Sequence, residues 1–374
     1  MDKRIEAVLL LAAVALSLWT HSLVLQNFYM PTYGNTGIHA APIREFAETG
    51  FYSREDHFSY GGGVPSTYVP LYRAGIASFV MLTGISVEAA SRLWVMLVAL
   101  LVPLGFYLLA KKIWGSETGL IAAFLASVPA DLLIYTIRPL PQAIAMALIP
   151  LVLWLVLERK WIPALLLTAV TVWTHQEAGL YLVAVQFGVA FIVLLERAWI
   201  HLSKKHVNDA CKERKAIAVL SIACWAAGAL AYIIWHFAVT GDVNFLAMNQ
   251  FVLHEGTAVT FTTFITQLGW TLLALSAVGV LAILGSAFKN KKWFSAGELI
   301  ALSAVVSGII LAKNELIGLS VLMQRFIAFL DQGMILIAAF GAWWIISRLV
   351  GGSVEKAIEN VKHRFVKPKH AHYY

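Results

Sequence analysis

Long apolar runs separated by short polar connections make up most of the 374-residue chain. The first run covers positions 5–25, which is about the 20 residues that a helix needs to cross a bilayer. It follows a short basic start and has no convincing small-residue cleavage site of the kind that ends a signal peptide. We interpret it as an uncleaved first transmembrane helix.

Nine later segments are apolar enough to be membrane-spanning helices. They lie near 87–110, 118–135, 141–157, 161–174, 178–196, 216–239, 262–286, 296–312 and 326–348. A further apolar stretch, 66–83, contains Pro70 and Arg73 and is barely long enough to cross a bilayer. We expect this stretch to form a juxtamembrane or re-entrant helix. The pattern predicts an all-α integral membrane bundle of about ten transmembrane helices over 1–350, with juxtamembrane helices in a first outer loop, 26–86.

The placement of basic residues predicts the orientation of the bundle. If the N-terminus is inside and 66–83 does not cross, 21 of the 28 Lys and Arg residues fall in inside segments. Inside loops are enriched in these residues, whereas a crossing at 66–83 would turn the most basic segments outward. We therefore expect both termini in the cytoplasm of a multi-pass cell-membrane protein. The basic tail, 351–374, is expected to form an interfacial helix on anionic lipid.

Composition supports the membrane interpretation and excludes other classes of protein. The chain is 60% hydrophobic and 13% charged, which would leave a soluble domain with large exposed apolar surfaces. Its net charge of +7 lies in short runs beside apolar segments, as topology signals do, so we expect no nucleic-acid partner. Cys211 and Cys224 have neither a pairing pattern nor metal-ligand spacing.

The longest polar stretch is the loop 26–70, and it carries two pairs at helical spacing. Asn35 and His39, and Arg44 and Glu48, are each four residues apart, so a helix over 36–49 would align both pairs. Asn35 or position 36 could cap that helix. One interpretation is an amphipathic helix that only rests on the membrane surface. The other is that His39 and its neighbours line a cavity that opens at the outer leaflet.

The same loop continues with Glu55, Asp56 and His57 close to a run of three glycines, 61–63. Carboxylates with an imidazole suit a divalent ion or a general base, and glycine lets a ligand approach the backbone closely. A solvated surface turn uses the same residue types, so both interpretations stay open.

Two further outer positions interrupt apolar sequence with ionisable groups. Asp131 lies at the outer end of a predicted span, where a charge is costly unless it is paired, hydrated or functional. Arg138 follows seven residues later and could form a structural ion pair with it. His175, Gln176 and Glu177 stand between two predicted spans, where they belong either to a site or to a tight turn.

The last predicted span opens with Arg325, and Asp331 follows six residues later. An arginine at the outer boundary is suited to bidentate contact with a phosphate, and Asp331 could pair with it or orient it. Simple anchoring at the membrane interface is the competing interpretation.

Taken together, these features resemble the GT-C superfamily of integral-membrane glycosyltransferases. The likeness is carried by 33–156, by the segment WTHQEAG at 173–179 and by QRFIAFLDQG at 324–333. Relatives in that superfamily include protein O-mannosyltransferases, aminoarabinose transferases and oligosaccharyltransferase catalytic subunits. The resemblance implies transfer of a sugar, hexosyl or pentosyl, from a polyprenyl-phosphate-linked donor to a glycan, lipid or protein acceptor at the outer leaflet, with Mg or Mn as a divalent cofactor.

The resemblance also implies roles for individual residues. The expected catalytic residues are Asn35, His39, Glu48, Asp56 and Asp131, with Asp131 and Asp56 as metal ligands. The expected substrate-binding residues are His57, Arg138, His175, Glu177 and Arg325. Position 35 holds an amide where the family has an acid, and an amide cannot accept a proton as a carboxylate does. Either Glu48 or Asp56 supplies that carboxylate, or the chain is a non-catalytic subunit of surface-glycan assembly. A transporter or flippase for lipid-linked glycans is the other alternative.

Overall fold

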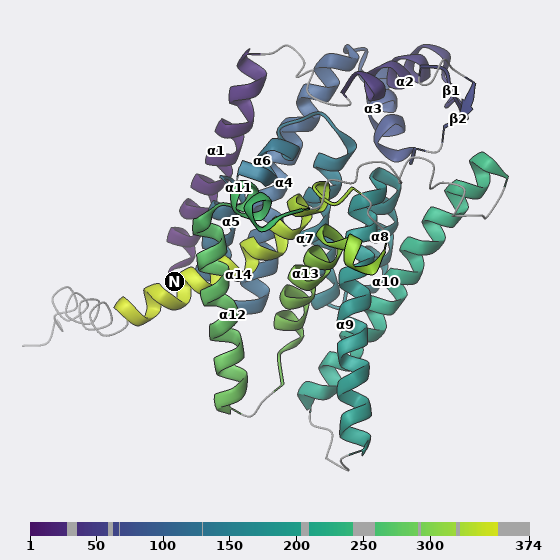
Figure 1. Ribbon diagram of the computed structural model, residues 1–374. Helices are drawn as coiled ribbons and strands as arrows, with labels where there is room; N and C mark the ends of the chain where they lie inside the picture. The colour runs from purple at the N-terminus through teal and green to yellow at the C-terminus, as the bar shows by residue number, and fades with distance from the viewer. Residues whose placement is uncertain are drawn as a thin grey trace, which may run out of the picture.

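The structure is a computed structural model, and it describes residues 1–27, 36–58, 63–66, 68–128, 130–202, 209–241, 259–290, 293–318 and 322–350. Within these ranges the chain is an almost entirely helical bundle (Figure 1). The elements are α1 (Lys3–Asn27), α2 (Thr36–Thr49), β1 (Glu55–Asp56), β2 (Val64–Pro65), α3 (Leu71–Thr83), α4 (Val87–Trp114), α5 (Ser116–Ala126), α6 (Ala130–Thr136), α7 (Pro141–Leu157), α8 (Trp161–Thr174), α9 (Gln176–Leu202), α10 (Asp209–Thr240), α11 (Phe261–Leu268), α12 (Trp270–Asn290), α13 (Ala296–Ala312), the 3-10 helix η2 (Asn314–Ile317) and α14 (Arg325–Val350).

Six of these helices, α1, α4, α9, α10, α12 and α14, are long and apolar enough to cross a membrane. This confirms a multi-pass membrane protein. The other four expected spans are the shorter apolar helices α5, α7, α8 and α13, which have 11 to 17 residues. The bounds of α7, α8 and α13 coincide with the predicted ranges.

Two predicted spans are broken in the structure. The span expected over 118–135 separates into α5 and the short helix α6, which begins at Ala130 and carries Asp131. The span expected over 262–286 separates into α11 and α12 at Gly269, whose φ of 76° lies in the left-handed region that glycine tolerates best. A hydropathy pattern cannot detect such breaks when both sides of them are apolar.

The first loop forms a small helical layer at one end of the bundle, together with the two-stranded antiparallel hairpin β1–β2 (Figure 1). Helix α2 occupies the range predicted for it. Helix α3 has 13 residues and ends at Gly84 in the left-handed conformation, so it is too short to span, as expected. Arg44 and Glu48 both lie on α2 as predicted, and Arg44 forms an ion pair with Glu88 at the start of α4.

Helix α14 lies in the middle of the bundle and packs against α4, α5, α6, α9, α11, α12 and α13 (Figure 1). Small residues let the backbones approach closely, as is common between membrane helices. A side chain at Gly279 of α12 would meet the carbonyl oxygen of Ile337 at 2.2 Å, and one at Gly308 of α13 would meet Leu330. These contacts fix α14 between its two neighbours.

The C-terminal ends of α9 and α12 lie at the end of the bundle away from α2 and α3 (Figure 1). The sequence places basic connections directly after both helices and places the first loop on the other face. The fold therefore agrees with the expected separation of these segments. The predicted interfacial helix in 351–374 lies outside the described residues.

Candidate functional site

A buried group of polar side chains lies where the first-loop layer meets the bundle, and we call it the polar cluster. Its members come from α2, the segment before α3, α3, α6, the α8–α9 turn and α14. They are His39, Tyr68, Arg73, Asp131, Tyr135, His175, Glu177, Arg325 and Asp331. The sequence separates these residues by up to 292 positions, and the helix packing brings them together.

The first-loop side of the cluster is built around His39 of α2 and Arg73 of α3, which are 3% and 2% exposed. The Nε of Arg73 donates to Nδ1 of His39 at 3.3 Å, so the two helices are joined by a buried polar contact. Burial, with the nearby Arg73 and His175, holds the pKa of His39 well below its usual value. His39 is therefore a neutral imidazole, as the acceptor role requires.

Tyr68 connects this side of the cluster to the bundle. Its ring packs edge-on against His39 at 4.8 Å and against His175 at 6.3 Å between centroids, while the Arg73 guanidinium lies 5.1 Å from its centre. Burial raises the pKa of the Tyr68 phenol above its usual range. Tyr68 thus supplies a neutral hydroxyl within the electrostatic reach of Glu177 and Arg325.

His175 and Glu177 are members of the cluster and not merely residues of a solvated turn. His175 ends α8, is buried, and accepts the backbone N–H of Ala178 at 3.2 Å. Burial and Arg325 lower its pKa to about 3. Glu177 begins α9 and binds Nη1 of Arg325 at 3.2 Å. The negative charge of Glu177 suits the N-terminal turn of its helix.

Asp331 does not form the ion pair with Arg325 that we considered. Its Oδ2 instead accepts the backbone N–H of Leu132 at 3.0 Å, which joins α14 to the first turn of α6. This contact places Asp331 beside Asp131. Both carboxyls are buried, and in the described part of the chain Oδ1 of Asp331 and Oδ2 of Asp131 have no hydrogen-bond partner. Buried carboxylates of this kind are costly in an apolar bundle.

The structural ion pair between Asp131 and Arg138 does not form among the described residues. The Arg138 guanidinium lies over the ring of Tyr135, 5.8 Å from its centre. The Tyr135 phenol is close enough to interact electrostatically with Asp131, Glu177, Arg138 and Arg325. These four charged residues, all predicted from sequence, therefore share one neighbourhood.

Helix α6 has only seven residues, and contacts from three other helices hold it in place. His21 of α1 is fully buried and bonds Oγ1 of Thr136 through Nε2 at 3.1 Å. Tyr72 of α3 donates its hydroxyl to the carbonyl of Pro139, just after α6. With Asp331, these contacts determine where Asp131 lies.

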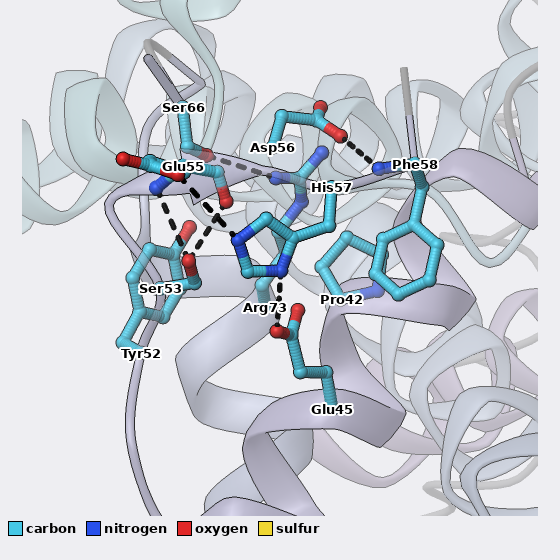
Figure 2. A pocket seen from close by; sticks show the side chains of 10 residues that line it. All are labelled: Pro42, Glu45, Tyr52, Ser53, Glu55, Asp56, His57, Phe58, Ser66 and Arg73. Atoms are coloured by element: carbon cyan, nitrogen blue, oxygen red, sulfur yellow. Dashed lines mark hydrogen bonds and ion pairs between the residues drawn. The ribbon is translucent and has the colours of Figure 1, made fainter. Parts of the chain in front are cut away.

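A separate hollow of about 270 Å³ opens in the first loop, and we call it the first-loop pocket (Figure 2). Its acidic side chains are Glu45, Glu55 and Asp56. Figure 2 shows His57 between Glu45, which its Nδ1 meets at 2.9 Å, and Glu55. Oδ1 of Asp56 accepts the backbone N–H of Phe58, so Asp56 turns the chain at the hairpin. Asp56 and His57 therefore lie in this pocket, with Arg73 in its wall.

Two predicted site residues fall elsewhere. Glu48 is exposed near the end of α2, and among the described residues no hydrogen bond or ion pair joins it to the cluster. Asn35 lies outside the described residues. Of the three glycines at 61–63, only Gly63 is described.

The described part of the chain holds no group of three or more His, Cys, Asp or Glu side chains arranged to bind a metal ion. Asp131 and Asp331 nevertheless offer carboxylate oxygens that no donor occupies, and Mg and Mn take such ligands. These two residues fit part of a coordination sphere. Asp56, the other expected ligand, lies in the first-loop pocket.

Sequence reasoning left four members of the cluster out of the predicted site: Tyr68, Arg73, Tyr135 and Asp331. Asp331 and Arg73 had a usable signal, because each is an ionisable residue inside an apolar segment. Tyrosine is common at membrane interfaces, so nothing in the sequence distinguished Tyr68 and Tyr135 from the other tyrosines.

Comparisons with known proteins agree with this fold. No protein-family model matches the chain, and no curated protein sequence matches it significantly. Solved structures of the oligosaccharyltransferase AglB from Archaeoglobus fulgidus are similar in fold. The apo form matches with a TM-score of 0.69 at 15% identity over 99% of this chain and 53% of that chain.

Two further AglB structures match over almost the whole chain. The complex with an inhibitory peptide and a dolichol-phosphate has a TM-score of 0.67 at 15% identity, covering 99% of this chain and 53% of that one. The complex with Zn and sulfate has a TM-score of 0.60 at 14% identity, covering 96% and 51%. The chain thus spans about half the length of these neighbours. Over that length its fold resembles that of the oligosaccharyltransferase, in agreement with the GT-C-like bundle expected from the sequence.

Proposed function

We propose that this protein is a membrane glycosyltransferase that transfers a sugar from a polyprenyl-phosphate-linked donor to an acceptor at the outer face of the membrane. The observation that carries the proposal is the polar cluster in a GT-C-type fold. The cluster contains two carboxyl groups, each with one oxygen that has no hydrogen-bond partner among the described residues, together with two neutral histidines and several cationic side chains. A site with such perturbed, buried groups is a candidate for catalysis. The resemblance in fold to AglB supports glycosyl transfer as the reaction class.

The reaction that fits these groups is a single displacement at the anomeric carbon. The oxygen of an acceptor hydroxyl attacks that carbon, the bond from carbon to phosphate oxygen breaks, and the phosphate leaves with the bonding electrons. The proton of the hydroxyl passes to a carboxylate acting as general base. We assign this role to Asp131, because it is the member of the predicted catalytic set that is both an acid and part of the cluster. One displacement inverts the configuration of the sugar.

Negative charge grows on the leaving phosphate, so cationic groups near it lower the barrier. Arg325 and Arg138 are close enough to the Tyr135 phenol to serve one ligand. A divalent cation held by Asp131 and Asp331, when bound, would add Lewis-acid stabilisation of the same charge. His39 and His175 are neutral and accept at Nδ1, so each can donate one hydrogen bond to the sugar from Nε2.

The acceptor and the sugar are left to experiment, with glycan, lipid and protein acceptors as the candidates. AglB has been solved with a peptide and with a dolichol-phosphate, which supports a lipid-phosphate carrier as the donor class here.

The test uses purified protein, radiolabelled polyprenyl-phosphate sugars and a membrane extract that supplies acceptors. Label should move to acceptor in wild type, and Asp131→Asn and Arg325→Ala should each reduce transfer by about 100-fold or more. Full activity in both variants would overturn the assigned roles. Absence of transfer with every donor, together with protein-dependent movement of the donor across vesicles, would favour a flippase.

A further inference from the structure

Arg73 is a buried cation of the cluster, and among the described residues no ion pair joins it to a carboxylate. It is 2% exposed and is the third residue of α3. Its guanidinium donates to Nδ1 of His39 at 3.3 Å, to the hydroxyl of Ser66 at 3.4 Å and to the carbonyl of Ile38 at 3.5 Å. All three acceptors are uncharged, and all three contacts are long for hydrogen bonds to a charged donor, which usually span about 2.7–2.9 Å.

The nearest acidic side chains do not supply the missing charge. Asp56 lines the first-loop pocket with Arg73, yet among the described residues no ion pair joins them. Glu177 is occupied by Arg325. Burying a guanidinium without a counter-ion is strongly unfavourable, so such a group is expected where an anion arrives as ligand.

The position of Arg73 fits a ligand that also reaches the rest of the cluster. Its guanidinium stacks on Tyr68, and Tyr68 lies within electrostatic reach of both Arg73 and Arg325. The cluster is therefore polarised: Arg73 lies on the first-loop side, the Arg325–Glu177 pair lies in the middle, and Asp131 and Asp331 lie against α6 and α14. A ligand phosphate between Arg73 and Arg325, which both lie within reach of Tyr68, would leave the hydroxyls of the ligand facing the two carboxyls.

We infer that Arg73 is an anion-binding residue of this protein, and that it contacts the phosphate of the lipid-linked donor. The inference rests on the proposed function and adds to it a residue that sequence reasoning did not include. A guanidinium presents a planar fork to phosphate oxygens, and Nη1, Nη2 and Nε are held here only by neutral acceptors that a phosphate can replace. Tyr68 and Ser66 add hydroxyls to the same position.

The experiment measures binding of decaprenyl phosphate to the full-length protein in neutral lipid nanodiscs, with uncharged decaprenol as the paired probe. Arg73→Gln should weaken the affinity for decaprenyl phosphate at least tenfold and leave the affinity for decaprenol unchanged. Arg73→Lys should have an intermediate affinity for decaprenyl phosphate. The matched control is Arg44→Gln, because Arg44 lies in the same loop, is exposed, and pairs with Glu88. It should bind like wild type.

Further arms identify the source of the phosphate. Inorganic phosphate should compete only weakly, and nanodiscs that contain phosphatidylglycerol should not abolish binding. If either competes as well as decaprenyl phosphate in an Arg73-dependent way, Arg73 recognises free phosphate or a lipid headgroup, and the donor assignment is overturned.

The outcomes separate this inference from the proposed function. If Arg73→Gln loses binding of decaprenyl phosphate and decaprenol equally, or if a fall in melting temperature accounts for the lost binding, Arg73 only joins α2 to α3. Unchanged binding of decaprenyl phosphate in Arg73→Gln would also overturn the inference. If wild type binds decaprenyl phosphate through Arg73 and yet transfers no sugar, the anion site stands and the transferase proposal fails.

Discussion

Arg325 and Glu177 form an ion pair, with 3.2 Å between Nη1 and Oε1, that joins the first residue of α14 to the first turn of α9. The positive end of a helix dipole disfavours a cation at the start of α14 and favours a carboxylate at the start of α9. The pair therefore lets Arg325 stand at a helix start inside the cluster. Glu177 is 8% exposed at its side chain whereas Arg325 is 36% exposed, so the carboxylate is buried while solvent reaches the arginine.

This pairing predicts unequal effects of removing either partner. Arg325→Ala should reduce transfer by about 100-fold, since one lost charge contact to a transition state costs about 2.7–4 kcal/mol. Glu177→Gln should reduce it less, through displacement of Arg325. Initial rates of sugar transfer at saturating donor would measure both, and the double variant should be no worse than Arg325→Ala because contacting residues are not additive. Additive losses would show that the two residues act independently.

The placement of Asp131 predicts that it, and not Glu48, is the essential carboxylate. Asp131→Asn keeps the size of the side chain and removes the proton acceptor, so transfer should fall by about 100-fold or more. Glu48→Gln is the matched control, since Glu48 is exposed on α2. Its rate should stay within about twofold of wild type in the same radiolabel assay. A large loss of transfer rate in Glu48→Gln would indicate that the general base is a first-loop carboxylate and not Asp131.

The contact between Asp331 and the Leu132 amide predicts a split between two substitutions. Asp331→Asn retains a carbonyl oxygen as acceptor, whereas Asp331→Leu leaves a buried N–H unsatisfied at about 1–3 kcal/mol. We expect a lower melting temperature in detergent for the leucine variant and a small change for the asparagine variant. Equal melting temperatures would contradict an anchoring role for Asp331.

The lowered pKa values of His39 and His175 predict acid sensitivity of the fold. Both imidazoles are neutral when folded, and each gains a proton on unfolding once the pH falls below about 6.5. The contribution of these two histidines to stability should therefore be constant above pH 6.5 and decline toward pH 3, by up to about 1.4 kcal/mol per pH unit for each histidine. Melting temperatures between pH 4.5 and 7.5 would measure this.

A variant isolates the histidine contribution. His175→Gln should flatten the decline in melting temperature below pH 6.5. An unchanged slope in His175→Gln would mean that other groups determine the acid sensitivity.

Two glycines of α12 give a matched test of the close helix packing. Gly279→Ala would place a Cβ 2.2 Å from the Ile337 carbonyl oxygen of α14, so it should destabilise by about 1–3 kcal/mol through overpacking. Gly285→Ala meets nothing within 4 Å and should stabilise by up to about 1 kcal/mol through helix propensity. Thermal unfolding of both variants in the same detergent would check the opposite signs.

Much of the fold was predictable from the sequence because the hydropathy pattern indicates where membrane helices lie. Helix α2 and the short, non-spanning α3 were both predictable, the second because Pro70 and Arg73 weaken a span. The breaks at α6 and at Gly269 were not, since both sides of each break are apolar. The ion-pair partners of Arg44 and Arg325 were not predictable because spacing reports only local neighbours, whereas Glu88 and Glu177 are 44 and 148 positions away.

The candidate site was predictable in its charged members and not in its aromatic ones. Asp131, His175 and Arg325 each interrupt apolar sequence, where an ionisable side chain is energetically unfavourable and therefore indicates a functional role. Tyr68 carries no such cost, and only the structure shows that it touches both His39 and His175.

The central position of α14 has a consequence for how the protein is made. Among the described residues, every helix that packs against α14 precedes it along the chain, so α4, α5 and α13 enter the membrane before this shared partner does. Until α14 is inserted, the faces of these helices that later contact it, including the surfaces at Gly308 and Gly279, must contact lipid or an insertion factor. Ribosome-stalled chains that end before Arg325 should therefore expose these faces to crosslinking, and release of α14 should close them in a single late step.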